Sequence, residues 1–259
     1  MEKSSTVIDM KRPIVKRFYR ERYSERFNEF YVKYKHTDMW IGVGKSCEFS
    51  VRMVDFAYEK VKITYDTLDE YIKENPEFGK SLVPLMLNNL EVPEFIKNMV
   101  DASQLAEVGP MACVAGMFAQ IVGEELMRNY NCNGVIVENG GDIYVNTDEE
   151  IKIGIFANFD SEFNKLSLVL EPGEYGVCTS SGKIGHSLNF GNADAVIVIS
   201  KDSAISDAFA TKYSNMVRTS EDVEKVLAKA KEEIGKSIEG IIVIYRDIIG
   251  ALGKVKFSY

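Results

Sequence analysis

The chain has 259 residues, of which 46% are hydrophobic and 27% are charged, and its formal net charge is −8. Its lysines and arginines are scattered, so we expect no basic surface for a nucleic-acid backbone. No stretch approaches the roughly 18 uninterrupted apolar residues of a membrane-spanning helix, and the polar start at 1–26 has no apolar stretch of signal-peptide length. The sequence therefore predicts a cytoplasmic protein with neither a nucleic-acid nor a membrane partner.

The first half of the chain is predicted to contain a hairpin and then helices. Alternating apolar and polar residues indicate a β-hairpin over 30–43 with its turn at 36–38. Apolar side chains three and four residues apart predict a long helix over 48–73, which ends at the following Asn-Pro pair. These side chains are Val51, Val54, Tyr58, Val61, Tyr65, Leu68 and Ile72. Short helical pieces are expected up to Leu90, and Pro93 opens a helix to Ala106.

The second half is predicted to be rich in strands. A helix over 110–130 has small residues in its first half, which suit either close packing or a close ligand. Apolar runs then predict strands over 134–138, 142–145, 151–156, 165–170, 175–178 and 194–200, the last of them buried on both faces. Helices over 203–218 and 220–234 and strands over 240–245 and 254–258 follow. Short turns between consecutive strands favour hairpins, so the predicted class is α+β, with antiparallel sheets flanked by helices.

Four cysteines are widely separated in the chain, at Cys47, Cys113, Cys132 and Cys178. No two of them form a Cys-x-x-Cys pair, and neither a zinc knuckle nor a dense disulfide framework is indicated. We therefore expect reduced thiols. Strand-end amides and Lys183 would favour the thiolate of Cys178, which predicts faster alkylation than at Cys132; an inert, packed cysteine is the alternative.

An Asn-Gly-Gly-Asp turn lies between the strands predicted over 134–138 and 142–145. One interpretation is purely structural: a tight hairpin turn formed by Asn139, Gly140, Gly141 and Asp142. Adjacent glycines also leave room for backbone amides and side-chain oxygens to contact a ligand. These four residues are therefore candidate ligand contacts.

Hydroxyl groups and glycines are concentrated after the strand predicted over 175–178. Thr179, Ser180, Ser181 and Gly182 follow this strand, and His186 comes shortly after them. Hydroxyl and amide donors suit phosphoryl oxygens, and a histidine can transfer protons near neutral pH. The same composition also fits a solvated hairpin loop, and both interpretations stay open on composition alone.

The helix predicted over 203–218 carries an acid and a hydroxyl one turn apart. Asp207 and Thr211 are four residues apart, so their oxygens lie on one helix face. Mg²⁺ accepts a carboxylate and a hydroxyl when phosphates and waters complete its shell. In the structural alternative, Asp207 lies in a first helical turn, where the helix dipole favours an acid, and Thr211 bonds a backbone carbonyl.

Three segments in one order carry a resemblance to a known family. Residues 108–116 include Val-Gly-Pro-Met and Ala-Gly, residues 137–143 read Val-Glu-Asn-Gly-Gly-Asp-Ile, and residues 179–211 run from Thr-Ser-Ser-Gly to Asp-Ala-Phe-Ala-Thr. Together they resemble the ApbE-like superfamily, related to FAD:protein FMN transferases, in which such segments surround the flavin diphosphate. The whole chain looks still more like an uncharacterised archaeal and bacterial branch that has been associated with sulfur assimilation and homocysteine formation.

This resemblance implies a single ApbE-like, T-fold-like domain over 1–259. Within it, 1–107 would form a divergent hairpin and helices, 108–217 the ligand-binding core, and 218–259 a last helix and strands. A homo-oligomer is compatible with this arrangement.

The resemblance also implies site roles. Asp207, Thr211 and a backbone carbonyl of Ala115 or Val114 would hold Mg²⁺ on the phosphates of FAD or FMN. A hydroxyl of a target protein would attack, and His186 would accept its proton.

The chain also departs from the transferase pattern. Ser-Leu-Asn-Phe-Gly at 187–191 replaces Asp-Pro-x-Thr-Gly after the histidine, and Ala115 stands where the transferases have a lysine. Three functions therefore stay open. They are a flavin transferase or related metal-dependent phosphoryl enzyme, a flavin- or nucleotide-binding protein without transfer, and a sulfur-assimilation component with Cys178 or Cys113 as thiol carrier.

Overall fold

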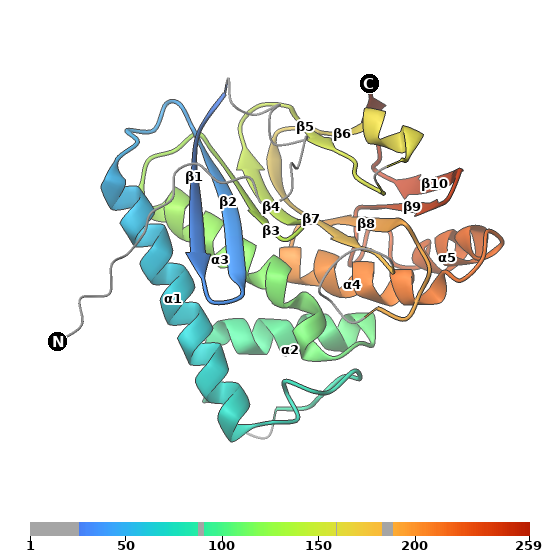
Figure 1. Cartoon of the computed structure of the whole chain (residues 1–259), viewed down its shortest axis with the longest axis horizontal. Coiled ribbons are helices and arrows are strands. Elements are labelled where there is room, and N and C mark those ends of the chain that lie inside the picture. The colour runs from blue at the N-terminus through green and yellow to red at the C-terminus, as the bar shows by residue number, and fades with distance from the viewer. Residues whose placement is uncertain (1–25, 88–90, 159, 183–188) are drawn as a thin grey trace.

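An eight-stranded antiparallel sheet runs through the centre of the structure (Figure 1). The computed structural model describes residues 26–87, 91–158, 160–182 and 189–259. Across the sheet the strands follow the order β1-β2-β3-β4-β7-β8-β9-β10, and every neighbouring pair is antiparallel. Their bounds are β1 Phe27–Tyr34, β2 Thr37–Gly44, β3 Gly134–Asn139, β4 Asp142–Thr147, β7 Gly173–Ser180, β8 Ala195–Ser200, β9 Gly240–Tyr245 and β10 Ile248–Gly253.

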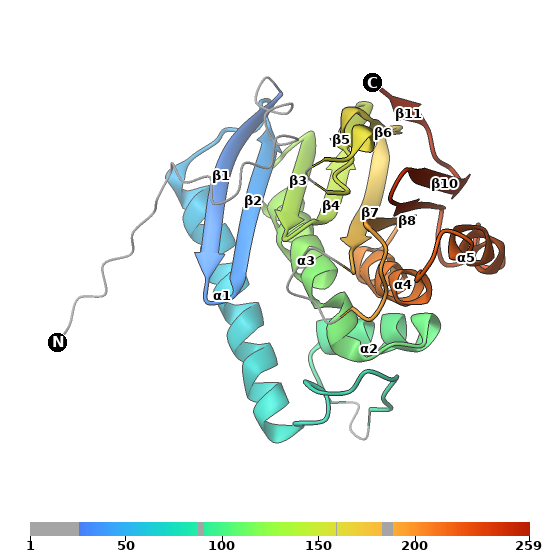
Figure 2. The same cartoon turned by 45° about the vertical axis from the view of Figure 1, so that its right-hand side comes forward.

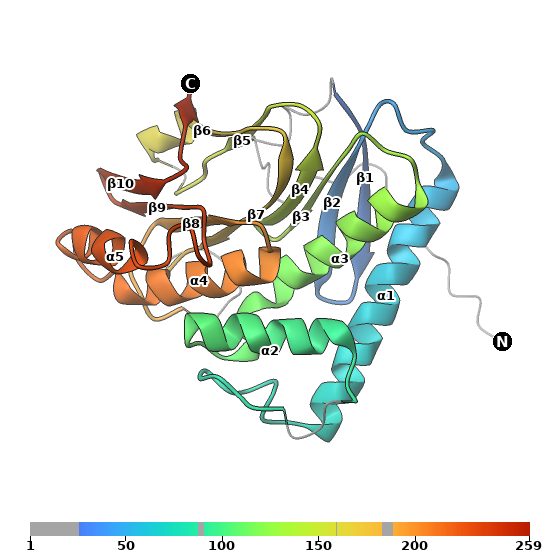
Figure 3. The same cartoon turned by 180° about the vertical axis from the view of Figure 1, so that it is seen from behind.

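Helices cover one face of this sheet. Helices α1 and α3 pack on the strands of the first half and α4 packs on β7 and β8, while α2 lies against α4 on the outer side (Figure 3). Helix α5 packs against β9 and the edge strand β10. The bounds are α1 Val51–Glu74, α2 Glu94–Ala106, α3 Val114–Asn129, α4 Ser203–Met216 and α5 Asp222–Ala230, with 3₁₀ turns η2 Pro110–Cys113 and η3 Glu162–Lys165.

A small antiparallel sheet covers part of the other face (Figure 2). Its order is β11-β6-β5, with β5 Ile151–Gly154, β6 Ser167–Leu170 and β11 Phe257–Ser258. The large sheet therefore has an apolar core on each side, one under the helices and one under the small sheet.

Strand β8 is apolar from Ala195 to Ile199 because side chains on both of its faces are buried. Val196 and Val198 belong to the core under the helices, whereas Ile197 and Ile199 belong to the core under the small sheet. Alternate side chains of a strand point to opposite faces, so covering both sides of β8 buries both sets of side chains. The predicted burial of this strand on both faces is confirmed, and the predicted α+β class with antiparallel sheets is confirmed as well.

Three local predictions differ from the structure. Strand β10 was not expected, because two glycines in Ile-Ile-Gly-Ala-Leu-Gly obscure its pattern. Residues 75–87 form turns, bends and irregular chain instead of short helices, and 88–90 lie outside the described residues. Val51 was placed on the buried face of α1, yet its side chain is 67% exposed because it is the first residue of the helix.

A disulfide joins Cys47 to Cys132, with their Cα atoms 4.8 Å apart. The expectation of reduced thiols was therefore wrong for this pair. The cysteines are 85 residues apart in sequence and meet because β2 pairs with β3, which places the loops at the strand ends together. Spacing along the chain carried no sign of this contact.

Within the described residues no single helix is long and apolar enough to cross a membrane. Helix α2 and the segment Pro110–Asn129 meet that test of length and composition only as a pair, which is bent by 104°.

Candidate functional site

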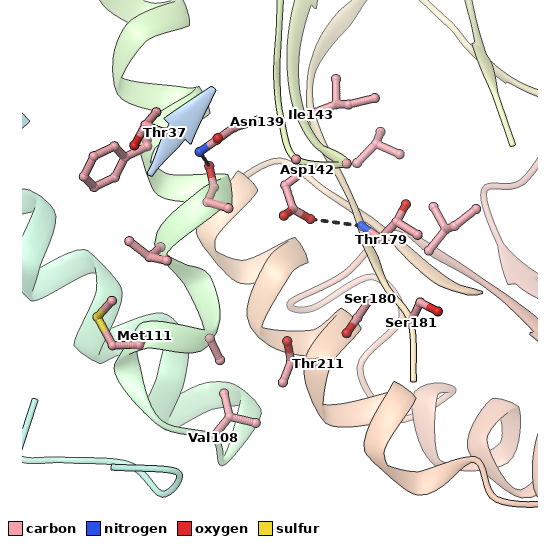
Figure 4. A pocket seen from close by; sticks show the side chains of 18 of the residues that line it. Thr37, Val108, Met111, Asn139, Asp142, Ile143, Thr179, Ser180, Ser181 and Thr211 are labelled. Carbon is pink, nitrogen blue, oxygen red and sulfur yellow. Dashed lines mark hydrogen bonds between the residues drawn. The ribbon is translucent and has the colours of Figure 1, made fainter. Parts of the chain in front are cut away.

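A cavity of about 1130 Å³ opens where the β3–β4 turn, the end of β7, the start of α3 and the second half of α4 meet. Figure 4 shows Asp142, Ser180 and Thr211 around one space, although they come from three different elements. The three separately predicted segments thus meet at one place. The antiparallel order β3-β4-β7 produces this meeting, because it places the β3–β4 turn beside the end of β7.

The β3–β4 turn forms one wall of the cavity. Gly140 and Gly141 have φ angles of 73° and 124°, in the region that favours glycine, and neither would bring an added Cβ within 4 Å of another atom. Asn139 and Asp142 face each other across this two-residue turn. All four predicted residues line the cavity. The glycines are therefore required by the tight turn, and the turn also reaches the cavity.

Two side-chain hydrogen bonds connect this turn to its neighbours (Figure 4). The Asn139 amide donates to the Ala115 carbonyl at 3.2 Å, and the Thr179 backbone N–H donates to the Asp142 carboxylate at 3.1 Å. The turn is thus attached to the first turn of α3 and to the end of β7. Asp142 is only 8% exposed, so its remaining accessible surface faces the cavity.

The end of β7 forms the opposite wall. Thr179, Ser180 and Ser181 line the cavity, as predicted for ligand contacts. Gly182 lies outside the lining and instead donates its N–H to the Ala193 carbonyl at 3.0 Å. A Cβ at Gly182 would come within 2.0 Å of the Gly191 carbonyl oxygen, so this glycine is explained by chain packing.

Asp207 lies in α4 and faces the start of α3. Its carboxylate accepts a hydrogen bond from the Gly116 backbone N–H at 2.9 Å. The amides in the first turn of a helix lack partners within the helix, so Asp207 caps α3 from another helix. From sequence, the structural alternative placed Asp207 in the first turn of its own helix. The structure instead has Asp207 capping the neighbouring helix α3. Asp202 serves as the N-cap of α4 and accepts from the Ile205 N–H at 2.9 Å.

Burial raises the pKa of Asp207 well above its usual range, and the negative charge of Asp142 raises the pKa further. The backbone amides of Gly116 and Ala115 act in the opposite direction. Two nearly buried carboxyl groups therefore lie near each other at this site, which costs free energy when both are ionised. A bound cation would remove that cost.

The predicted Mg²⁺ ligands fit such an ion in their chemistry. Thr211 and Ala115 line the cavity, and the Asp207 carboxylate is attached to the same first turn of α3. Their donor atoms are oxygens, which Mg²⁺ prefers. No group of three or more His, Cys, Asp or Glu side chains suited to a metal occurs in the described ranges, so ligand oxygens and waters would have to complete the shell.

The small residues of η2 and α3 divide between close packing and the cavity lining. A Cβ at Gly116 would lie 2.3 Å from the Ser203 carbonyl oxygen, and one at Gly123 would lie 2.2 Å from the Tyr144 ring. These glycines allow close packing on α4 and on the sheet. Ala112 and Ala115 line the cavity instead.

His186 lies outside the described residues. The free thiols can be placed: Cys113 and Cys178 are fully buried. Burial raises the pKa of both thiols, and the nearby carboxylates raise it further. The alternative of an inert, packed Cys178 is therefore favoured, because α4 covers the strand-end position and the Ser203 carbonyl accepts from its S–H at 3.3 Å. The comparison with Cys132 no longer applies, because Cys132 is in the disulfide.

Residues before position 108 also line the cavity, which motif reasoning missed. Thr37 is the first residue of β2, and Tyr65, Leu68 and Ile72 come from one face of α1. The spacing of the α1 residues was visible in the sequence and predicted their shared face. It did not show that this face reaches a cavity, because helix-core contacts have the same pattern.

Comparisons with known proteins identify relatives of this chain. A family model described as "AbpE bacteria" matches residues 20–237. The UPF0280 proteins of Methanococcus vannielii and Methanocaldococcus jannaschii are 39% and 40% identical over 194 and 195 residues, which is 73% of this chain and 77% of each relative.

Solved structures with the same fold are more distant in sequence. The flavinyl transferase ApbE of Pseudomonas stutzeri, in its apo form, aligns with a TM-score of 0.52 at 12% identity, over 88% of this chain and 94% of that one. The ApbE protein of Thermotoga maritima aligns with a TM-score of 0.52 at 13% identity, over 88% and 97% of the two chains. The flavin transferase ApbE of Vibrio cholerae aligns at 0.50 and 16% identity, over 87% and 96%. The chain therefore belongs to the family described as AbpE bacteria, beside the archaeal UPF0280 proteins, and it shares the fold of the solved ApbE structures.

Proposed function

We propose that this protein binds a flavin nucleotide, FAD or FMN, through its phosphates and Mg²⁺, and that it transfers FMN from FAD to a hydroxyl of a target protein. The observation that carries the proposal is the cavity lined by Asp142, Thr211 and the hydroxyl-bearing end of β7. Asp207 lies outside this lining, but its carboxylate is bonded to the first turn of α3 beside it. The solved structures named as flavin transferases support it through their shared fold.

The phosphates would bind between the β3–β4 turn and the end of β7. Thr179, Ser180 and Ser181 bring hydroxyl groups to this place, and Gly140 and Gly141 bring backbone amides without side chains of their own. These donors are needed because the chain as a whole carries a net charge of −8. Asp207, Thr211 and the Ala115 carbonyl would hold Mg²⁺, which when bound neutralises charge on the phosphates and polarises the phosphoryl group.

The transfer step balances without an oxidant or reductant. The oxygen of a Ser or Thr hydroxyl in the target forms a bond to the phosphorus on the FMN side, and the bond from that phosphorus to the bridging oxygen breaks. AMP leaves with the bridging oxygen, and His186 would accept the hydroxyl proton. The role of His186 remains a prediction from the resemblance.

The test is incubation of the purified protein with FAD, Mg²⁺ and candidate acceptor proteins, followed by mass spectrometry of the acceptor. A covalent FMN adduct that requires both Mg²⁺ and Asp207 supports transfer. Tight FAD binding without any adduct, across acceptors from the native extract, would favour the alternative of flavin binding without transfer. A protein that binds neither FAD nor FMN in Mg²⁺ sinks the proposal.

The thiol-carrier alternative has less support. Cys113 and Cys178 are fully buried with raised thiol pKa values, and Cys47 and Cys132 form a disulfide. A thiol carrier needs an accessible thiolate. A role in sulfur assimilation would therefore have to use the cavity and not a cysteine.

A further inference from the structure

Asn189 makes three hydrogen bonds at the rim of the cavity. Its side-chain amide nitrogen donates to the Ser180 hydroxyl and to the Ser214 hydroxyl, each at 2.8 Å. Its side-chain oxygen accepts from the Gly191 backbone N–H, also at 2.8 Å. Asn189 thus connects the end of β7 to the last turns of α4.

The third bond determines which end of the amide faces the serines. An Asn oxygen and nitrogen are distinguished by the hydrogen-bond network around them. Because a backbone N–H can only donate, the atom that contacts Gly191 must be the oxygen. The NH₂ group of Asn189 therefore faces both Ser180 and Ser214.

This orientation determines what the Ser180 hydroxyl can do. The amide nitrogen of Asn189 has no available lone pair, so Ser180 accepts from it and cannot donate back. Asn189 is the one hydrogen-bonding partner that the described residues give to the Ser180 side chain. Ser180 lines the cavity and is 8% exposed. Its own proton is thus available to the cavity.

We propose that Asn189 is a positioning residue that makes Ser180 a hydrogen-bond donor toward the cavity, and that this donor selects a phosphoryl oxygen of the ligand. The inference rests on the proposed function for the class of ligand, an organic diphosphate. It adds a residue outside the cavity lining, Asn189, which determines that the hydroxyl of the lining residue Ser180 donates toward the cavity.

The variant Asn189→Asp tests the inference because it keeps the shape and reverses the polarity. An aspartate still accepts from the Gly191 N–H, so the chain path at 189–191 is retained. Both of its oxygens only accept when ionised, so Ser180 and Ser214 must now donate to it. Ser180 then presents lone pairs to the cavity, where they repel a phosphoryl oxygen.

The experiment measures inorganic pyrophosphate, FAD and riboflavin binding in Mg²⁺ by titration calorimetry. We expect Asn189→Asp to weaken pyrophosphate and FAD binding by about tenfold or more, since a hydrogen bond to a charged group contributes about 1.5–3 kcal/mol. Riboflavin, which has no phosphate, should bind the variant and the wild type equally.

A double-mutant cycle with Ser180→Ala separates the proposed route from a general effect of the new charge. If Asn189 acts through Ser180, the loss caused by Asn189→Asp becomes several-fold smaller in the Ser180→Ala background. An equal loss in both backgrounds overturns the inference, and so does wild-type protein that fails to bind pyrophosphate. Pyrophosphate binding with this pattern, but without FAD binding, would refute the flavin proposal and leave the role of Asn189 intact.

Discussion

Replacing Asp207 by Asn or by Ala separates its structural role from its proposed role as a metal ligand. Asn keeps an oxygen that can accept from the Gly116 N–H, whereas Ala leaves this buried donor without a partner. An unsatisfied buried donor costs about 1–3 kcal/mol, so Asp207→Ala should be less stable than Asp207→Asn by that amount. Asp207→Asn should be at least as stable as wild type at neutral pH, because it removes a buried charge near Asp142.

Ligand binding should respond differently from stability. Both variants lose the charged metal ligand, so both should bind FAD in Mg²⁺ more than about tenfold more weakly, a loss of about 1.4 kcal/mol or more. A chelator should reduce the FAD affinity of wild type to that of the variants. Urea unfolding and titration calorimetry on the same samples measure the two effects. Unchanged FAD affinity in Asp207→Ala, or equal wild-type affinity with and without Mg²⁺, would show that Asp207 only caps α3.

The raised pKa of Asp207 also predicts the direction of a pH effect in metal-free protein. Burial and the charge of Asp142 make the folded state retain the Asp207 proton to a higher pH than the unfolded chain. The contribution of this group to stability is therefore fully present below the unfolded pKa of about 4 and is lost as pH rises through the folded pKa. Wild type should lose stability relative to Asp207→Asn as pH rises above about 4. A constant difference between pH 4 and 8 would contradict the reasoning.

Three further predictions concern packing and cysteines. Gly116→Ala should destabilise the fold by about 1–3 kcal/mol and weaken Mg²⁺-dependent FAD binding, because the added Cβ would lie 2.3 Å from the Ser203 carbonyl oxygen. Urea unfolding measures the first effect and calorimetry the second. A variant with wild-type stability would refute the close packing. The Cys47–Cys132 disulfide closes a span of 85 residues. Its reduction should lower the free energy of unfolding by up to about 4–5 kcal/mol in the chain-entropy model. Urea unfolding with and without reductant measures this loss, and equal midpoints would contradict it. Cys178 should resist iodoacetamide in native protein and react after unfolding; rapid native labelling, detected by peptide mass spectrometry, would show that the thiol is accessible.

Much of the fold could be predicted because its signals are local. The apolar run 194–200 predicted a strand buried on both faces, and β8 has that environment. Strand β10 was missed because Gly250 and Gly253 interrupt its apolar pattern. Gly250 is explained only by α5, since a Cβ there would lie 2.7 Å from the Leu227 side chain. Patterns along a chain report which side chains are buried, but not which distant element covers them.

The candidate site, like the fold, has features that the sequence indicated and others that only the structure shows. The sequence alone indicated the residue types: the Asn-Gly-Gly-Asp turn, the hydroxyl-rich end of β7, and the pair Asp207 and Thr211. Turn conformation and helical spacing are local properties, so these predictions needed no partner. Only the tertiary structure decided that Asp207 caps α3, that Asn189 orients Ser180, and that Cys47 meets Cys132. Each of these contacts joins residues that become neighbours only when their elements pack or pair in the fold, and that arrangement is not encoded in spacing along the chain.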